Sequence, residues 1–276
     1  AQIPARQQNP LPSKGQVVSA ASLKVFSGTR ASMSEIIDEG VIGRFFEMAV
    51  AVRSDSPEDG WRIELDGRVV KTPLGKPFVV PTAALADGIA GEWNAQGEKI
   101  VPASMPLASL ANAAIDKIAP EPKVFIDQLV GYARSDLLCY WAQAPDDLVA
   151  RQRDAWQPVL DWAHENLEAR FIATTGVIPV EQPQESLTVI ADLLGGITTH
   201  HLTGLVDLAG RMNSVLLALA VWKGRLGADE AFNAAYLDDT FQEEQWGQDT
   251  DAIHRRSAIR AEILSTAGFL VFLDQR

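Results

Sequence analysis

The chain has 276 residues, and its composition and charge exclude several classes of protein. Hydrophobic residues make up 47% and charged residues 22%, which is typical of globular chains and not of disordered ones. The 36 acidic and 24 basic side chains give a formal net charge of -12, which repels nucleic-acid phosphates and anionic lipid surfaces. We therefore expect no nucleic-acid partner, and the length suits two modest domains.

Residues 1–40 differ in composition from the rest of the chain. Pro, Gln and Ser are frequent there, and the first acidic residue is Glu35, after four basic ones at Arg6, Lys14, Lys24 and Arg30. This pattern predicts a mobile or extended tail, and it is also typical of a mitochondrial transit peptide. A native extension, or a natural start at Met33, explains the same pattern.

Two further features bear on compartment and membrane. The single cysteine, Cys139, excludes an internal disulfide and lies in an apolar run, which predicts a buried structural thiol in a reducing compartment. The longest apolar run, Val215 to Trp222, is far shorter than the roughly 18 to 20 residues that span a bilayer. We expect no membrane insertion.

Residues 41–120 have the patterns of strands and turns. Apolar side chains alternate at Phe46, Met48, Val50 and Val52, and again at Trp61, Ile63 and Leu65. Asp66-Gly67 then predicts a two-residue hairpin, because glycine tolerates the positive φ of such a turn. A helix is expected after Thr82 as its N-cap, with Leu85, Ile89 and Trp93 on one face and Gly97 at its end. The region is predicted to be a small β-rich α/β domain.

Residues 121–276 have helical periodicity. A helix at 107–118 ends at Pro120 and Pro122, which mark the expected domain boundary. Pro158 is expected to begin a helix. Further helices are predicted at 186–194, 199–209, 212–223, 229–246 and 249–273, and the helix at 212–223 is apolar nearly all round, which places it at the centre. The fold class is therefore α+β, a β-rich domain followed by an all-helical bundle.

Catalytic and cofactor motifs are missing from the sequence. The four histidines form no i, i+4 pair, and there is no second cysteine for a metal site. Neither glycine-rich phosphate-binding pattern occurs, and no serine lies in a nucleophile-elbow pattern. We expect no cofactor, no metal and no catalytic residue.

The remaining feature is an acidic cluster near the end of the chain. Its carboxylates surround Gln242, Trp246 and Gly247, and they are Asp238, Asp239, Glu243, Glu244, Asp249 and Asp251. Several of them share a helix face without enough cations between them, which costs stability. One interpretation is a solvated helix face with Asp249 as an N-cap. The others are a carboxylate pair in acid-base catalysis, or an anionic surface that receives basic side chains of a partner beside Trp246.

Ordered sequence blocks over roughly residues 43–270 resemble the Atp-twelve family of ATP synthase assembly chaperones. The blocks in the first region are Gly60-Trp61, Leu65 to Arg68, Lys71-Thr72-Pro73, Val80-Pro81-Thr82, Glu92-Trp93, Gln96-Gly97-Glu98, Met105-Pro106-Leu107 and Leu110 to Asp116. Those in the second are Asp136 to Tyr140, Gln152, Trp156-Gln157-Pro158, Asp161-Trp162, and Leu237-Asp238-Asp239 with Gln242, Trp246-Gly247 and Asp249.

The resemblance implies an ATP-independent, non-catalytic chaperone, a monomer when free, that binds the unassembled alpha subunit and shields its beta-facing surface. It implies a location in an alphaproteobacterial cytoplasm or a mitochondrial matrix. The partner-binding residues that it implies are Asp239, Glu244, Trp246, Gln242, Glu243 and Asp249. Position 239 usually holds Glu in the family, so the carboxylate of Asp239 reaches less far.

Two other functions are compatible with the sequence. A hydrolase with paired carboxylates predicts that Asp239 or Glu244 lies in a closed cleft with a raised pKa. A permanent structural subunit predicts a large interface depleted of charge. The acidic cluster argues against the second of these.

Overall fold

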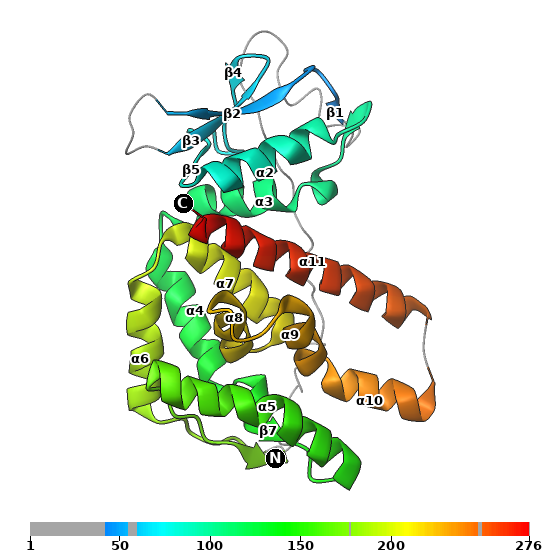
Figure 1. The fold of residues 1–276 in the computed structure, drawn as a ribbon. Coiled ribbons are helices and arrows are strands. Elements are labelled where there is room, and N and C mark those ends of the chain that lie inside the picture. The colour runs from blue at the N-terminus through cyan, green and yellow to red at the C-terminus, as the bar shows by residue number, and fades with distance from the viewer. Residues whose placement is uncertain (1–41, 55–59, 177, 248–249, 276) are drawn as a thin grey trace, which may run out of the picture.

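The computed structural model describes residues 42–54, 60–176, 178–247 and 250–275. A small sheet with two helices lies at one end, and a larger helical part lies below it in the view of Figure 1. The long last helix, α11 (Thr250–Asp274), lies between them and contacts α2 and α3 of the first part and α7 of the second. The α+β class predicted from the sequence is confirmed.

The main sheet is antiparallel and is centred on β3. This strand (Trp61–Leu65) pairs with β2 (Ala49–Arg53), β4 (Arg68–Val69) and β5 (Val79–Val80). The predicted hairpin turn joins β3 to β4, with φ of 49° at Asp66 and 75° at Gly67. A separate pair links β1 (Ile42–Gly43) to β6 (Lys99–Ile100).

The prediction of which side chains of β2 face the core is wrong, because the buried and exposed positions are shifted by one residue. Met48 is 59% exposed, whereas Ala49 is 3% exposed and faces the core. The small side chain of Ala49 lets α2 (Ala83–Asn94) approach closely, and the Asn94 amide bonds both the N–H and the carbonyl of Ala49 at 2.8 Å. Local alternation cannot report this close approach, because it depends on a residue 45 positions away.

The helix α2 follows its sequence signals. The Thr82 hydroxyl accepts a hydrogen bond from the backbone N–H of Leu85, as an N-cap does. Leu85, Ile89 and Trp93 are all buried, and the helix ends at Asn94, shortly before the predicted Gly97. The same Thr82 hydroxyl donates to the Phe272 carbonyl at 2.8 Å, so the cap also ties α2 to α11.

Four elements follow β6 and lead from the first part, to which α3 belongs, into the second part, where α4 packs against α6 and α7. They are η2 (Pro102–Ser104), α3 (Pro106–Ala113), the π-helical turn η3 (Ala114–Ile118), and α4 (Pro122–Arg134). The sequence patterns place the domain boundary at the pair Pro120 and Pro122 and miss α4. Proline is accepted there because it occupies the first helical position, where its missing N–H leaves no bond unmade.

Besides α4, the helical part comprises α5 to α11 and a small parallel pair of strands. The first four of these helices are α5 (Asp146–Leu167), α6 (Gln184–Gly195), α7 (Thr199–Met212) and α8 (Val215–Trp222), followed by α9 (Ala228–Ala235) and α10 (Leu237–Trp246). After η4 (Leu137–Cys139), β7 (Tyr140–Trp141) pairs with β8 (Thr174–Thr175), a pair that helical periodicity did not predict.

Two expectations for this part are corrected. Pro158 lies inside α5 and does not begin a helix, because the buried positions Trp156 and Leu160 continue one apolar face across it. The helix expected over 229–246 is broken at Tyr236 into α9 and α10. The break lets α10 leave the direction of α9 (Figure 1).

The centre of the helical part is α8, as predicted from its apolar sequence. Its first six residues, Val215 to Ala220, are completely buried. At its start, the buried Asp136 carboxylate accepts hydrogen bonds from the Ser214 hydroxyl at 2.7 Å and the Leu216 N–H at 3.1 Å. Cys139 is likewise completely buried, and burial raises the pKa of its thiol. No helix in the described ranges is long and apolar enough to cross a membrane.

Candidate partner-binding site

Four of the six carboxylates of the acidic cluster lie on α10, which projects from the lower part of the molecule in Figure 1, and Asp251 lies in the first turn of α11. This helix contacts α5 and α9 and buries only Phe241, which is 7% exposed. It carries four carboxylates, Asp238, Asp239, Glu243 and Glu244, and no basic residue. We call α10 the acidic arm.

Two of the four carboxylates are paired with arginines from other helices. Glu244 accepts from Arg151 of α5 at 2.7 Å, and the Arg151 guanidinium also lies 5.2 Å from the centroid of the Phe241 ring. Glu243 forms an ion pair with Arg256 of α11. These cations supply the charge that the local sequence lacks, and they hold the arm against α5 and α11.

The base of the arm is fixed by polar contacts. Asp238 accepts from the Gln152 amide at 2.7 Å, and partial burial raises its pKa. At the break before the arm, the Tyr236 hydroxyl donates to the Arg211 carbonyl at 2.8 Å. Burial is also the main cause that raises the pKa of Tyr236, and the negative charge of Asp239 adds to it.

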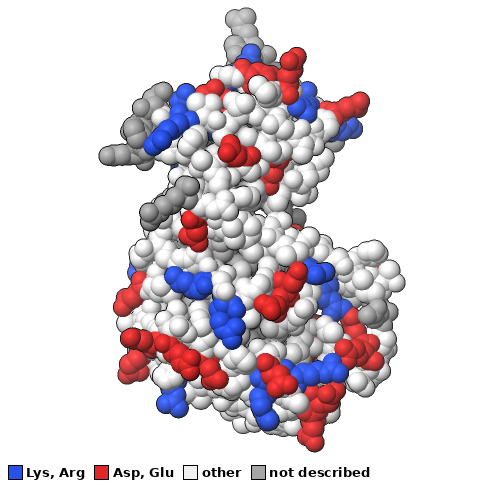
Figure 2. Space-filling model, viewed as in Figure 1, with Lys and Arg blue, Asp and Glu red and all other residues white. Residues whose placement is uncertain are grey.

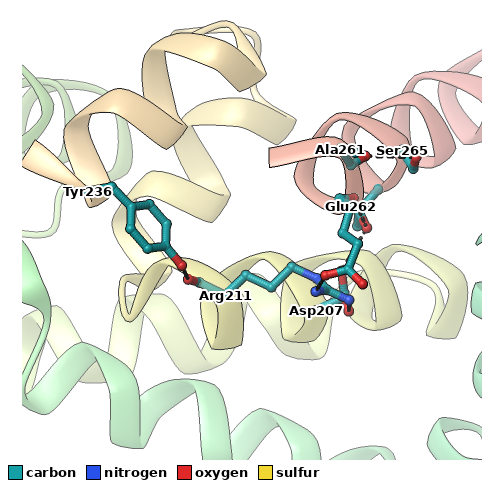
Figure 3. A network of polar contacts seen from close by, with 7 residues as sticks. Asp207, Arg211, Tyr236, Ala261, Glu262 and Ser265 are labelled. Atoms are coloured by element: carbon teal, nitrogen blue, oxygen red, sulfur yellow. Dashed lines mark hydrogen bonds and ion pairs between the residues drawn. The ribbon is translucent and has the colours of Figure 1, made fainter. Parts of the chain in front are cut away.

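Figure 3 shows that Arg211 continues this set of contacts from α7 to α11. Its guanidinium donates to both carboxylate oxygens of Asp207, at 2.7 and 3.0 Å, and pairs with Glu262 of α11. Thr266 donates to the same Asp207 at 2.7 Å. The break at Tyr236 is therefore anchored to the end of α7, which Asp207 and Arg211 join to α11.

The outer side of the arm is open. Asp239 and Gln242 are exposed, and no hydrogen bond or ion pair of their side chains is seen within the part of the chain that the structure describes. Trp246 at the end of the arm is 81% exposed, a large apolar surface to leave in water. Asp249 lies outside the described residues. The arm thus presents one unpaired carboxylate and one aromatic side chain to solvent.

A groove of about 290 Å³ separates the inner side of the arm from α9 and α11. Phe232 and Ile253 supply apolar lining, and Glu243, Arg256 and Arg260 supply charged lining. Asp239 and Glu244 do not line it, and both side chains are exposed, unlike the acid-base pair of a closed hydrolase cleft. The described residues contain no group of three or more metal-ligating side chains.

The sequence patterns missed the residues that position the arm. Arg151 precedes Glu244 by 93 residues, and Gln152 precedes Asp238 by 86. One of these residues, Gln152, belongs to the sequence blocks that carry the family resemblance. It is a polar residue on the apolar face of α5, and a buried polar side chain needs a hydrogen-bond partner.

Comparisons with known proteins give a consistent result. A family model described as ATP12 chaperone protein matches residues 43–164. The crystal structure of Atp12 from Paracoccus denitrificans has 37% sequence identity and a TM-score of 0.80, covering 84% of this chain and 98% of that one. A protein from Agrobacterium tumefaciens whose structure is described as a chaperone candidate has 39% identity and a TM-score of 0.80, covering 85% and 87%. Mitochondrial protein atp12 of Schizosaccharomyces pombe is 26% identical over 202 residues, 69% of each chain.

The fold and these matches place the chain in a family of chaperones. The chain belongs to the ATP12 chaperone family, the Atp-twelve family that the sequence blocks resemble.

Proposed function

We propose that this protein is an assembly chaperone of ATP synthase, and that it binds the unassembled alpha subunit through the acidic arm without using ATP. Membership of the ATP12 chaperone family supports an assembly role. One observation supports this binding site: the projecting helix α10 carries both Asp239, a carboxylate without a partner in the described residues, and the exposed ring of Trp246. Carboxylates steer a basic partner, and Trp is favoured as a buried anchor at interfaces.

The acidic side chains of the proposed site have different roles in binding. Asp239, with Gln242 beside it, is free to receive a basic side chain of alpha. Glu243 and Glu244 bind the partner only by sharing or exchanging the arginines that hold them now. Asp249 joins the site as an acidic residue just beyond the arm. Release follows when the beta subunit offers alpha a larger complementary surface, so no nucleotide-driven step is needed.

The test is co-expression of alpha alone with this chain, scoring the soluble fraction of alpha and its co-elution. We expect Asp239→Lys and Trp246→Ala each to reduce complex formation at least tenfold, since charge reversal and loss of an anchor each cost roughly 1.4 kcal/mol or more. Asp192→Lys is the matched control, because Asp192 is an exposed aspartate on α6 and its reversal changes the net charge equally.

The outcomes separate specific binding from general charge effects. A loss with Asp239→Lys but not with Asp192→Lys supports binding at the arm. Equal losses would mean that only the net charge matters. Alpha that aggregates equally with and without the wild-type chain, at low salt, would refute the proposed function.

A further inference from the structure

The outer face of α11 carries a row of apolar side chains that the fold does not use. Ile253, Leu264 and Val271 are 37%, 42% and 56% exposed. They are 11 and 7 residues apart, three and two turns, so they lie within about 20° of one another on one face of the helix. The row extends over roughly 27 Å at 1.5 Å per residue. We call it the α11 stripe.

The buried face of the same helix points in another direction. Ile263, Phe269 and Leu270 are buried, and Leu270 fits so closely to α7 that a Cβ on Gly204 would lie 2.6 Å from its side chain. On the stripe side, a Cβ on Gly268 would meet nothing within 4 Å. The stripe is therefore not required to hold α11 in place.

The stripe is continuous with the acidic arm. Its first member, Ile253, lines the groove beside the arm together with Ser257 and Arg260, which lie on the same face of α11. The stripe then continues out of the groove to Leu264 and Val271. Figure 2 shows acidic and basic side chains spread over both parts of the visible face, with fewer of them at the waist between the two parts.

We propose that the α11 stripe is the surface that shields the apolar part of the chaperone's client, while the acidic arm binds the basic side chains next to it. The occupant is an apolar segment with basic residues at one end, of the kind that a subunit exposes before assembly. This inference rests on the proposed function and assigns its shielding step to named residues. Charge complementarity sets the orientation of the client segment, with its basic residues toward the Ile253 end, which adjoins the acidic arm. Arg256 and Arg260 also lie at this end, but they are paired with Glu243 and Asp229, so they leave the carboxylate of Asp239 available.

A variant that removes the stripe without disturbing the fold tests the proposal. Leu264→Gln with Val271→Gln replaces two exposed apolar side chains by a good helix former. Burial of each side chain against a client corresponds to roughly tenfold in affinity, so we expect the double variant to bind about 100-fold more weakly. The loss should not depend on salt, unlike that of Asp239→Lys.

The matched control is Ile172→Gln, because Ile172 is 42% exposed, as Leu264 is, but lies near β8 and not on α11. A photoreactive side chain placed at position 264 or 271, and at 172 for comparison, gives a second measurement that does not depend on affinity. Cross-links to the client from 264 and 271 but not from 172 are expected.

Each contrary outcome has a distinct meaning. If the double variant keeps the client soluble as well as wild type does, and 264 gives no cross-link to it, the stripe proposal is wrong and the proposed function stands. If 264 cross-links to a second copy of this chain, the stripe is a dimer surface and the proposal is overturned. If the wild-type chain does not protect alpha at all, both proposals fail.

Discussion

The helices α8 and α10 are similar in length, but α8 is held by apolar burial and α10 is held mainly by polar contacts. In α8 the first six residues have no exposed surface, and contacts on every side fix the helix. In α10 a single residue, Phe241, is buried, and two arginines and a glutamine from other helices hold the rest.

This difference separates stability from binding within one fold. Apolar burial contributes most of the free energy of folding, so α8 is part of the scaffold. A helix held by a few exposed polar contacts opens at lower free energy, and its outer side chains remain available to a partner. The hydrogen bond from Tyr236 to Arg211 anchors the base of the arm, although the arm itself buries little.

The largest effect is expected from truncating the scaffold. Leu217→Ala in α8 removes a completely buried side chain and should lower the free energy of unfolding by roughly 2 to 5 kcal/mol. Phe241→Ala in the arm should lower it less, while amide exchange over 237–246 becomes faster, because the arm opens without the core. Urea unfolding and hydrogen exchange measure the two effects. Equal losses of global stability in the two variants would contradict the assignment of α8 to the scaffold and of α10 to a separately opening arm.

A pH-dependent effect is expected at the start of α8. Burial raises the pKa of Asp136 to about 6, although hydrogen bonds from Ser214 and Leu216 oppose the rise. The folded state then holds this proton more tightly than the unfolded chain does. The stability contributed by this carboxyl is complete below its ordinary pKa near 3.8 and declines as the pH rises to about 6.

The variant Asp136→Asn isolates this effect, since asparagine does not titrate. The stability of wild type minus that of the variant should decrease by roughly 1 to 3 kcal/mol between pH 4 and pH 7. Urea unfolding across that range gives the difference directly. Parallel profiles for the two proteins would show that the Asp136 pKa is not raised in the folded state.

The smallest effect on stability is expected from the contact that holds the arm. Arg151→Met removes the exposed ion pair to Glu244 and should change the free energy of unfolding by less than about 1 kcal/mol. The arm should nevertheless exchange its amide hydrogens faster. Arg153→Met on the same helix is the control, since Arg153 is exposed, and the arm should be unaffected by it. A large global loss with Arg151→Met would mean that the arm belongs to the core.

The features that the sequence predicted correctly depend on neighbours in the chain. The cap at Thr82, the turn at Asp66-Gly67 and the central position of α8 each follow from a local pattern. The predictions that were wrong depend on distant contacts. The phase of β2 is set by Asn94 against Ala49, and Pro158 is carried inside α5 by an apolar face that continues on both sides of it.

The acidic site also has features that local sequence predicts and features that depend on distant residues. Periodicity placed Asp239 and Glu243 on one helix, which is confirmed, but it could not supply the arginines that pair with Glu243 and Glu244. The partner-binding roles of Asp239, Gln242 and Trp246 stay predictions. The structure adds that these three are exposed, whereas Glu243 and Glu244 are paired with arginines.

Hydrogen exchange of this chain in complex with the alpha subunit tests the central claim most directly. We predict that amides of 237–246 on the acidic arm exchange more slowly in the complex than in the free chain, while those of α8 do not change. A complex in which alpha co-elutes with the chain but the arm exchanges as fast as before would contradict the account.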